Sequence, residues 1–407
     1  MIPAILWAGF VPRGLEPVFE RIRPLIARAT AGNRVVVVVV SAVAVVAIVA
    51  TGLLIAVRSG GTAQATASAT PTVMPSDSPS PSPSDSPSPS PSDTPTAAPA
   101  PGELVYADLD GVLIRADLAL RLPMAISIGD NAVARPQSGF SSASIVYQSY
   151  EEYSEDRYLM IFQEGTATDI GGVRSARPYF VRWVAEYKAL YGHFGGDSKV
   201  LNEVIPAMSG SIYNMDDLFG GSCPYHRTTT RAAPHNAYTN SAALISCLPQ
   251  KGYPTTYQGG PTRPFVDDTP ATDRPASQSI TVPYHTVSVG YQFDPATDKY
   301  IRLLNGKKQI DPANNQQVFA RNIIVMFQTV SNDYLETSTG IQRIDISNVG
   351  SGKAIVFKEG KAINGTWKKT SDTALTRYYD DSGNEIPLVR GEIFIQSVPP
   401  GTAVTAK

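Results

Sequence analysis

The chain has 407 residues, and its 34 basic and 36 acidic side chains give a formal net charge of −2. This balance lacks the basic stripe that neutralises phosphates, so the charge excludes a nucleic-acid binder. The part from about residue 103 to 400 is long enough for two domains of ordinary size.

An uninterrupted apolar stretch at 35–57 contains neither charge nor proline. About 20 apolar residues cross a hydrocarbon core of roughly 30 Å, so this stretch predicts a transmembrane helix. Five arginines precede it and only Arg58 follows closely, which places the tail at 1–34 in the cytoplasm. The long start also argues against a cleaved signal peptide. We therefore expect a single-pass protein of the cell membrane that contacts the lipid bilayer, with extracytoplasmic folded domains.

Residues 58–102 are dominated by Pro, Ser, Thr and Ala, and the octad Ser-Asp-Ser-Pro-Ser-Pro-Ser-Pro occurs twice, at 76–83 and 84–91. Alternating prolines remove backbone donors and favour the extended polyproline II conformation. Such a composition buries no core, so the sequence predicts a disordered linker. It acts either as a spacer through a cell wall or as an inert tether.

The first folded region, 103–250, begins with strand patterns. An apolar run at 122–128 leads into a loop, and two further runs at 144–149 and 157–163 flank an acidic loop as in a hairpin. Apolar residues then recur at helical spacing over 176–188, behind a proline that suits a first helical turn. These patterns predict strands and at least one amphipathic helix.

Another strand pattern at 189–194 precedes Asp197, which can cap a second helix. This alternation predicts a layered α/β sandwich domain over 103–250. A strap at 251–280, rich in Pro, Thr and Gly, then connects it to a small, mainly antiparallel β domain at 281–400, where Asn-Gly and Glu-Gly turns separate alternating runs. The expected fold class is α+β.

The two cysteines, Cys223 and Cys247, fall in the same predicted domain. A disulfide between them closes a loop of about 25 residues and stabilises the fold by roughly 3 kcal/mol in the chain-entropy model. Two buried free thiols are the alternative. The chain has no Cys-x-x-Cys pair and its four histidines are scattered, so we predict no metal and no cofactor.

Arg174, Ser175 and Arg177 lie at the start of the predicted helix. A helix N-terminus attracts anions, and two guanidinium groups three residues apart can bind the same phosphate or carboxylate. The pattern therefore indicates an anion site. Both guanidinium groups can instead pair with acidic residues inside the fold, namely Glu152, Glu164 or Asp130.

Catalytic candidates are fewer and rest on residue type alone. His193 suits a general base, a metal ligand or a hydrogen-bonded structural residue. Glu152 suits an acid-base group with Asp130 or Asp197 as its partner. Ser175 lacks the Gly-x-Ser-x-Gly pattern that surrounds many nucleophilic serines. Spacing alone supports no mechanism, so the sequence leaves open whether the protein is an enzyme.

Several motifs in the folded part are shared with one protein family. They lie at 129–131 (Gly-Asp-Asn), 134–139 (Ala-Arg-Pro-Gln-Ser-Gly), 145–147 (Ile-Val-Tyr), 172–180 (Gly-Val-Arg-Ser-Ala-Arg-Pro-Tyr-Phe), 193–196 (His-Phe-Gly-Gly), 233–236 (Ala-Pro-His-Asn), 350–352 (Gly-Ser-Gly), 365–367 (Gly-Thr-Trp) and 391–392 (Gly-Glu). On these motifs the chain resembles the YerB-like bacterial envelope (lipo)proteins, a domain of unknown function with N- and C-terminal parts.

The resemblance covers about 106–400 and implies a first domain built as a layered α/β sandwich, without an established activity. Typical members resemble lipoproteins held by a lipidated N-terminal cysteine, whereas this chain has no cysteine before Cys223. Members also tend to carry a glutamate where this chain has Gln148, which counts against an acid-base role there. Glu152 and Arg157 match the family pattern.

The sequence thus predicts a cell-envelope protein that binds an anionic cell-wall ligand or an envelope protein partner. A hydrolase acting on a cell-wall polymer and a purely structural scaffold are the alternatives. The predicted ligand-binding residues are Arg135, Arg174, Ser175, Arg177, His193 and Asn236.

Overall fold

The computed structural model describes residues 102–152, 155–216 and 223–407. The predicted tail at 1–34, the apolar stretch at 35–57 and the linker up to residue 101 lie outside these ranges. Within them, no helix is long and apolar enough to cross a membrane. The structure therefore gives no support for the predicted transmembrane helix.

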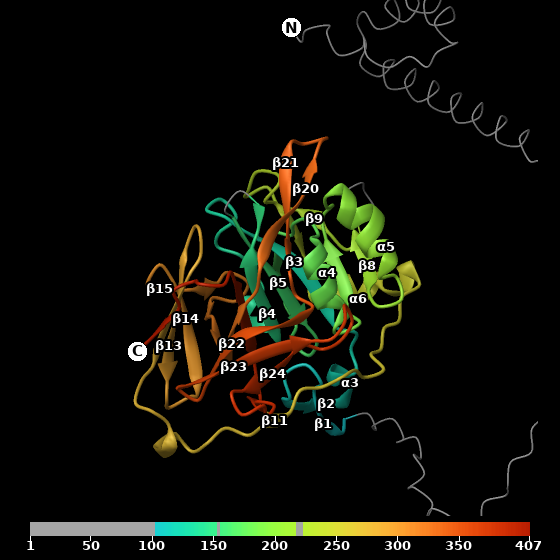
Figure 1. The fold of residues 1–407 in the computed structure, drawn as a ribbon. Coiled ribbons are helices and arrows are strands. Elements are labelled where there is room, and N and C mark those ends of the chain that lie inside the picture. Colours follow the sequence, from blue (N-terminus) through green and yellow to red (C-terminus); the bar gives the residue numbers. More distant parts are fainter. Residues whose placement is uncertain (1–101, 153–154, 217–222) are drawn as a thin grey trace, which may run out of the picture. The chain divides into compact units, whose positions relative to one another are not determined.

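A ten-stranded mixed sheet forms the centre of the fold (Figure 1). Segments far apart in the sequence meet in it, because β26 pairs in parallel with both β4 and β19. In sheet order its strands are β24 (Arg377–Asp380), β23 (Lys361–Lys369), β22 (Gly350–Lys358), β19 (Asn322–Phe327), β26 (Ile393–Val398), β4 (Ile145–Tyr150), β5 (Asp156–Phe162), β3 (Met124–Asp130), β7 (Leu190–His193) and β8 (Tyr213–Asp216).

A second, six-stranded sheet packs on one face of the first. Its buried side chains alternate along β13, where Val289, Tyr291 and Phe293 join a core cluster with Ile126 and Met160 of the large sheet. The strands are β15 (Lys307–Lys308), β14 (Lys299–Leu304), β13 (Ser288–Asp294), β12 (Ser279–Pro283) and β27 (Thr405–Ala406), with β18 (Phe319–Ala320) pairing β14.

Five small ladders complete the strand structure. One of them, the β20–β21 hairpin, projects beyond the large sheet (Figure 1). The ladders are β1 (Leu104–Tyr106) with β2 (Leu113–Arg115), β6 (Ile170–Gly171) with β10 (Ala237–Thr239) and β9 (His226–Arg227), β11 (Phe265–Val266) with β25 (Leu388–Val389), β16 (Ile310–Asp311) with β17 (Gln316–Gln317), and β20 (Val330–Glu336) with β21 (Ile341–Ile346).

Helices are few and short. The longest in the described part is α4 (Pro178–Ala185), which starts with proline at its first position and buries Phe180, Trp183 and Val184. Trp183 stacks on Tyr147 of β4 at 4.7 Å between ring centroids, so α4 covers part of the second face of the large sheet. The others are α3 (Ala116–Ala119), the π-helical turn η3 (Val200–Val204), α5 (Ile205–Ala207), α6 (Ser241–Cys247), and the 3₁₀ turns η1 (Phe140–Ser142), η4 (Pro249–Lys251) and η5 (Ala271–Asp273).

The predicted α+β fold with a layered α/β sandwich is wrong, since the described chain is mostly strand and arranged in several sheets. No layer of helices covers the second face of the large sheet within the described residues. There α4 shares the core with apolar side chains of C-terminal strands, including Ile346, Trp367 and Leu388. Residues from distant strands thus bury the apolar surface that the prediction assigned to helices.

Most of the individual element predictions for the first region are confirmed. The run predicted at 122–128 forms β3, the predicted hairpin forms antiparallel β4 and β5, and the run at 189–194 forms β7. The helix predicted at 176–188 is present but shorter, as α4. Short-range periodicity was therefore a sound guide to local structure and a poor one to the layers.

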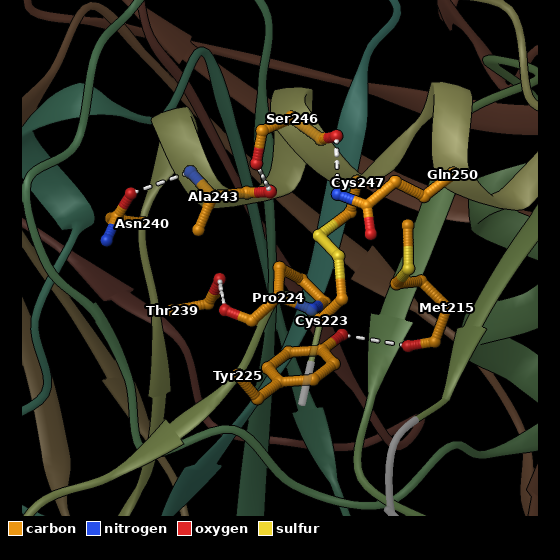
Figure 2. Close-up of a disulfide and its surroundings, with 10 residues drawn as sticks. All are labelled: Met215, Cys223, Pro224, Tyr225, Thr239, Asn240, Ala243, Ser246, Cys247 and Gln250. Carbon is orange, nitrogen blue, oxygen red and sulfur yellow. Dashed lines mark hydrogen bonds between the residues drawn. A yellow bond between two sulfur atoms is a disulfide. The ribbon is translucent and has the colours of Figure 1, made fainter. Parts of the chain in front are cut away.

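Cys223 and Cys247 form a disulfide, with 5.9 Å between their Cα atoms (Figure 2). It joins the segment before β9 to the end of α6. Asn240 caps this helix by accepting a hydrogen bond from the Ala243 amide at 2.8 Å. On the other side, the Tyr225 hydroxyl donates to the Met215 carbonyl at 2.8 Å (Figure 2). The bond thus ties α6 to the sheet edge at β8.

Removing this disulfide is expected to destabilise the protein. In the double variant Cys223→Ser and Cys247→Ser, the open loop of about 25 residues gains entropy in the unfolded chain, so the free energy of unfolding falls by about 3 kcal/mol. Urea denaturation of the full chain measures the change. Wild-type protein with reductant serves as the control and is expected to match the variant; an unchanged midpoint in both would contradict the prediction.

Candidate functional site

The ends of β3, β4 and β5 place two sets of polar side chains on opposite faces of the large sheet. Asp130 and Asp156 are cross-strand partners, and so are their neighbours Gly129 and Arg157. Because successive residues of a strand point to opposite faces, the two aspartates share one face and Arg157 lies on the other. Two polar clusters therefore lie back to back through the sheet.

The first cluster, the carboxyl pair, consists of Asp130 and Asp156, both at most 1% exposed. Asp130 accepts hydrogen bonds from Arg135 Nε at 2.6 Å and Gln137 Nε2 at 2.9 Å. Thr286 donates its hydroxyl to Asp156 at 3.3 Å. Burial, reinforced by the charge of Asp130, raises the pKa of Asp156 to about 8. Arg135, predicted to bind a ligand, is thus ion-paired inside the fold.

The second cluster, the arginine–glutamate cluster, consists of Arg157, Arg177, Glu151 and Glu152. Arg177 precedes α4 and donates to Glu152 Oε2 at 2.9 Å from Nε and to Glu151 Oε1 at 2.5 Å from Nη2. Arg157 pairs with Glu151 and donates to the Ser175 carbonyl at 2.6 Å. Burial alone would raise the pKa of Glu152, but Arg177 holds it below its usual range. These charges neutralise one another.

The β20–β21 hairpin closes this cluster from the C-terminal side. Arg343 of β21 lies 3.7 Å from Glu152 and 2.5 Å from Glu336 of β20. Glu336 in turn accepts a hydrogen bond from the Ser198 amide at 2.9 Å. The hairpin is therefore held against both the residues that follow β4 and the turn that follows β7.

Arg174 differs from these arginines. Its side chain lies across Gly129, where an added Cβ would come 2.7 Å from Arg174 Cγ. Within the described ranges the Arg174 guanidinium makes no hydrogen bond or ion pair, in contrast to Arg157 and Arg177. Burial, reinforced by Arg157, lowers the pKa of Arg174 to about 10. An anion at this guanidinium would relieve both effects.

Two further nitrogen atoms near Arg174 also lack partners in the described part of the chain. Arg157 Nε and His235 Nδ1 are buried and make no hydrogen bond. Burial and the charge of Arg174 lower the pKa of His235, which indicates that His235 and Arg174 are close enough to repel. Arg174, Arg157 and His235 thus form a region with several nitrogen atoms that have no partner among the described residues.

His193 and Asp197 have structural contacts. The His193 ring is fully buried, and its nitrogens lie 2.9 Å from the Gly195 carbonyl and 2.7 Å from Asn214 Oδ1. Asp197 accepts a hydrogen bond from the Val200 amide at 2.9 Å and so caps the turn after β7. Both side chains are therefore engaged in holding this end of β7.

Asn236 lies in the loop before β10, where it accepts a hydrogen bond from Arg227 at 2.6 Å and donates to the Thr228 carbonyl at 3.3 Å. Among the residues predicted for the site, the structure brings Arg174, Ser175, Arg177 and Glu152 together. No hydrogen bond or ion pair among the described residues joins Asn236 to the arginine–glutamate cluster.

Sequence reasoning missed several residues of these clusters. Glu151 and Asp156 belong to the loop that was interpreted only as an acidic hairpin turn. Extending the strand alternation into that loop could have predicted that the two side chains point to opposite faces of the sheet. Thr286, Glu336 and Arg343 are more than 120 residues away in sequence, and no local pattern marks them. In the described ranges, no group of three or more His, Cys, Asp or Glu residues is placed to hold a metal ion.

Comparisons with known proteins agree with this architecture. Residues 109–254 match the N-terminal domain, and residues 280–395 the C-terminal domain, of the "Protein of unknown function (DUF3048)" family. The chain is 28% identical over 299 residues to "Putative lipoprotein YerB" of Bacillus subtilis, covering 72% of this chain and 86% of that protein. It also resembles the crystal structure of Bacillus subtilis YerB, with a TM-score of 0.65, 27% identity, and coverage of 74% of this chain and 99% of the other.

These findings correct the predicted attachment and location. The relative is named as a lipoprotein, and no described helix could span a membrane. Bilayer contact through a transmembrane helix, a single-pass location and a cytoplasmic N-terminus are therefore not supported. The motifs around Arg135, Arg174 and His193, in contrast, pointed to the correct relatives. With both of its domains matched, the chain belongs to the YerB-like DUF3048 family of proteins of unknown function.

Proposed function

We propose that this protein binds an anionic ligand of the cell envelope at Arg174. The single observation that carries the proposal is the partly buried Arg174 guanidinium, which makes no hydrogen bond or ion pair with the described residues while Arg135, Arg157 and Arg177 are all paired. A buried charge costs free energy unless it is paired. A ligand oxyanion is the partner that this charge lacks.

The surroundings of Arg174 support an anion rather than a neutral ligand. Burial lowers the pKa of Arg174, and the positive potential of Arg157 and Arg177 adds to this. Glu151 and Glu155 partly offset it. Arg157 Nε and His235 Nδ1 offer further buried nitrogen atoms without partners. A planar guanidinium binds carboxylates and phosphates through two parallel hydrogen bonds, which suits either anion.

Replacement of Arg174 tests the proposal. Isothermal titration of the full chain with inorganic phosphate and with acetate is expected to show binding of at least one anion, weakened tenfold or more in Arg174→Ala because the charge-assisted hydrogen bonds are lost. Arg174→Lys keeps the positive charge but loses the planar guanidinium that can donate two parallel hydrogen bonds. Its anion affinity is expected to lie between those of the wild type and Arg174→Ala.

Arg115→Ala is the matched control, because Arg115 is exposed and its one ion pair among the described residues is with Asp117. Its anion affinity is expected to equal that of the wild type. The proposal is refuted if the wild type binds neither anion. It is also refuted if Arg174→Ala binds every anion with the same affinity as the wild type.

A further inference from the structure

A cavity of about 370 Å³ lies beside the arginine–glutamate cluster, on the side that faces the β20–β21 hairpin. Four segments form it: the end of β4 with the residues that follow, the turn between β12 and β13, the β20–β21 hairpin, and Pro399 after β26. Arg174 is not among its lining residues, so this cavity is separate from the anion site. Its volume suits one small ligand.

Two aromatic rings form one corner of the cavity. Tyr150 and His285 meet edge to face, with 4.3 Å between their ring centroids. Burial lowers the pKa of His285, so the imidazole is neutral at pH 7. The corner is therefore an uncharged, largely apolar surface against which C–H groups of a ligand can pack.

Two amide side chains of the β20–β21 hairpin also line the cavity. Asn332 and Gln342 are exposed and come from the paired strands β20 and β21. The Asn332 amide makes no hydrogen bond with any described residue, and Gln342 donates only Nε2, to the Arg343 carbonyl at 3.1 Å. Free amide donors and acceptors thus face the cavity from this side.

Two carboxylates, Glu151 and Glu152, lie at the boundary between the cavity and the arginine–glutamate cluster. Arg177 pairs with both, at 2.5 and 2.7 Å, so their charges are neutralised and their positions fixed. No Lys or Arg lines the cavity in the described part of the protein. A cavity with hydrogen-bonding groups, an aromatic corner and no unpaired charge favours a polar ligand without charge.

We propose that this cavity binds a neutral pyranose sugar. Sugar hydroxyls both donate and accept, which matches the free amides of Asn332 and Gln342. One face of a pyranose ring is built of C–H groups and fits the corner formed by Tyr150 and His285. The ligand class differs from the anion proposed for Arg174.

Saturation-transfer NMR on the full chain tests the proposal with methyl β-glucopyranoside and N-acetylglucosamine as probes. Saturation is expected on the ring C–H protons of at least one sugar. Asn332→Ala and Gln342→Ala are each expected to weaken binding about two- to tenfold, the effect of one hydrogen bond. Asn332→Trp, at an exposed position that tolerates bulk, is expected to fill the cavity and abolish binding.

Gln258→Ala is the matched control, since Gln258 is an exposed amide outside the cavity and its loss is expected to leave sugar binding unchanged. Arg174→Ala is also expected to bind sugar normally, which separates a failure here from a failure of the anion proposal. The inference is overturned if neither sugar receives saturation, if Asn332→Trp binds as well as the wild type, or if n-butylamine binds while both sugars do not.

Discussion

Replacing Arg177 by alanine is expected to lower the free energy of unfolding by about 3–5 kcal/mol, the usual effect of removing one member of a buried ion pair. Arg177 is 5% exposed and pairs with Glu151 and Glu152, so its loss leaves two buried carboxylates with less compensation. It also lies at the start of α4, whose side chains cover the large sheet. Urea denaturation of the full chain, followed by tryptophan fluorescence, measures the change.

Two comparisons sharpen this prediction. Arg115→Ala removes an exposed pair with Asp117 and is expected to change the free energy of unfolding by less than about 1 kcal/mol. Arg177→Lys keeps the charge but loses the simultaneous contacts with both glutamates, so an intermediate loss is expected. A loss in Arg177→Ala no larger than that in Arg115→Ala would show that the cluster contributes little to stability.

Stability is expected to fall as the pH rises from about 4 to about 8, because of Asp156. The pKa of Asp156 is raised from 3.8 to about 8 by burial and then by Asp130. Between these pH values the carboxyl group keeps its proton in the folded protein and has released it in the unfolded chain. Each unit of rising pH therefore lowers the free energy of unfolding. At about 1.4 kcal/mol per unit, this carboxyl lowers stability by at most about 6 kcal/mol across the window.

The variant Asp156→Asn tests this dependence, since the amide is uncharged at every pH. Its unfolding midpoint is expected to lie close to the wild type at pH 4 and above it at pH 8. Thr286 and Arg135, which contact the carboxyl pair, remain in place. Asp273→Asn, at an exposed turn, is expected to keep the wild-type slope. Parallel pH profiles of Asp156→Asn and the wild type would contradict the assignment.

Local signals predicted much of the secondary structure. Pro178 and the apolar residues behind it gave the start and the buried face of α4, because a helix needs only neighbours three and four residues apart. Alternation and branched residues gave β4 and β5 for the same reason. The arrangement of the elements in layers was mispredicted. The segment that packs on a given face of the sheet can lie far away in the sequence, so local patterns do not identify it.

The candidate site shows the same division. The motif from Gly172 to Phe180 correctly brought Arg174, Ser175 and Arg177 together, because they lie on one short segment. Whether each arginine is paired depended on residues elsewhere: Glu152 lies 25 residues before Arg177. Only the folded structure shows that Arg177 has a carboxylate partner and that Arg174 has none among the described residues.

By itself, the sequence determined the local elements, the family and the segment that carries the unusual arginine, because each depends on residues within a few positions of one another. The tertiary structure decided the shared ten-stranded sheet, the burial of Asp156 beside Asp130, and the closure of the arginine–glutamate cluster by Arg343. Those features arise from contacts between distant segments. Burial and pairing energies there depend on which surfaces meet, and no short stretch of sequence specifies that.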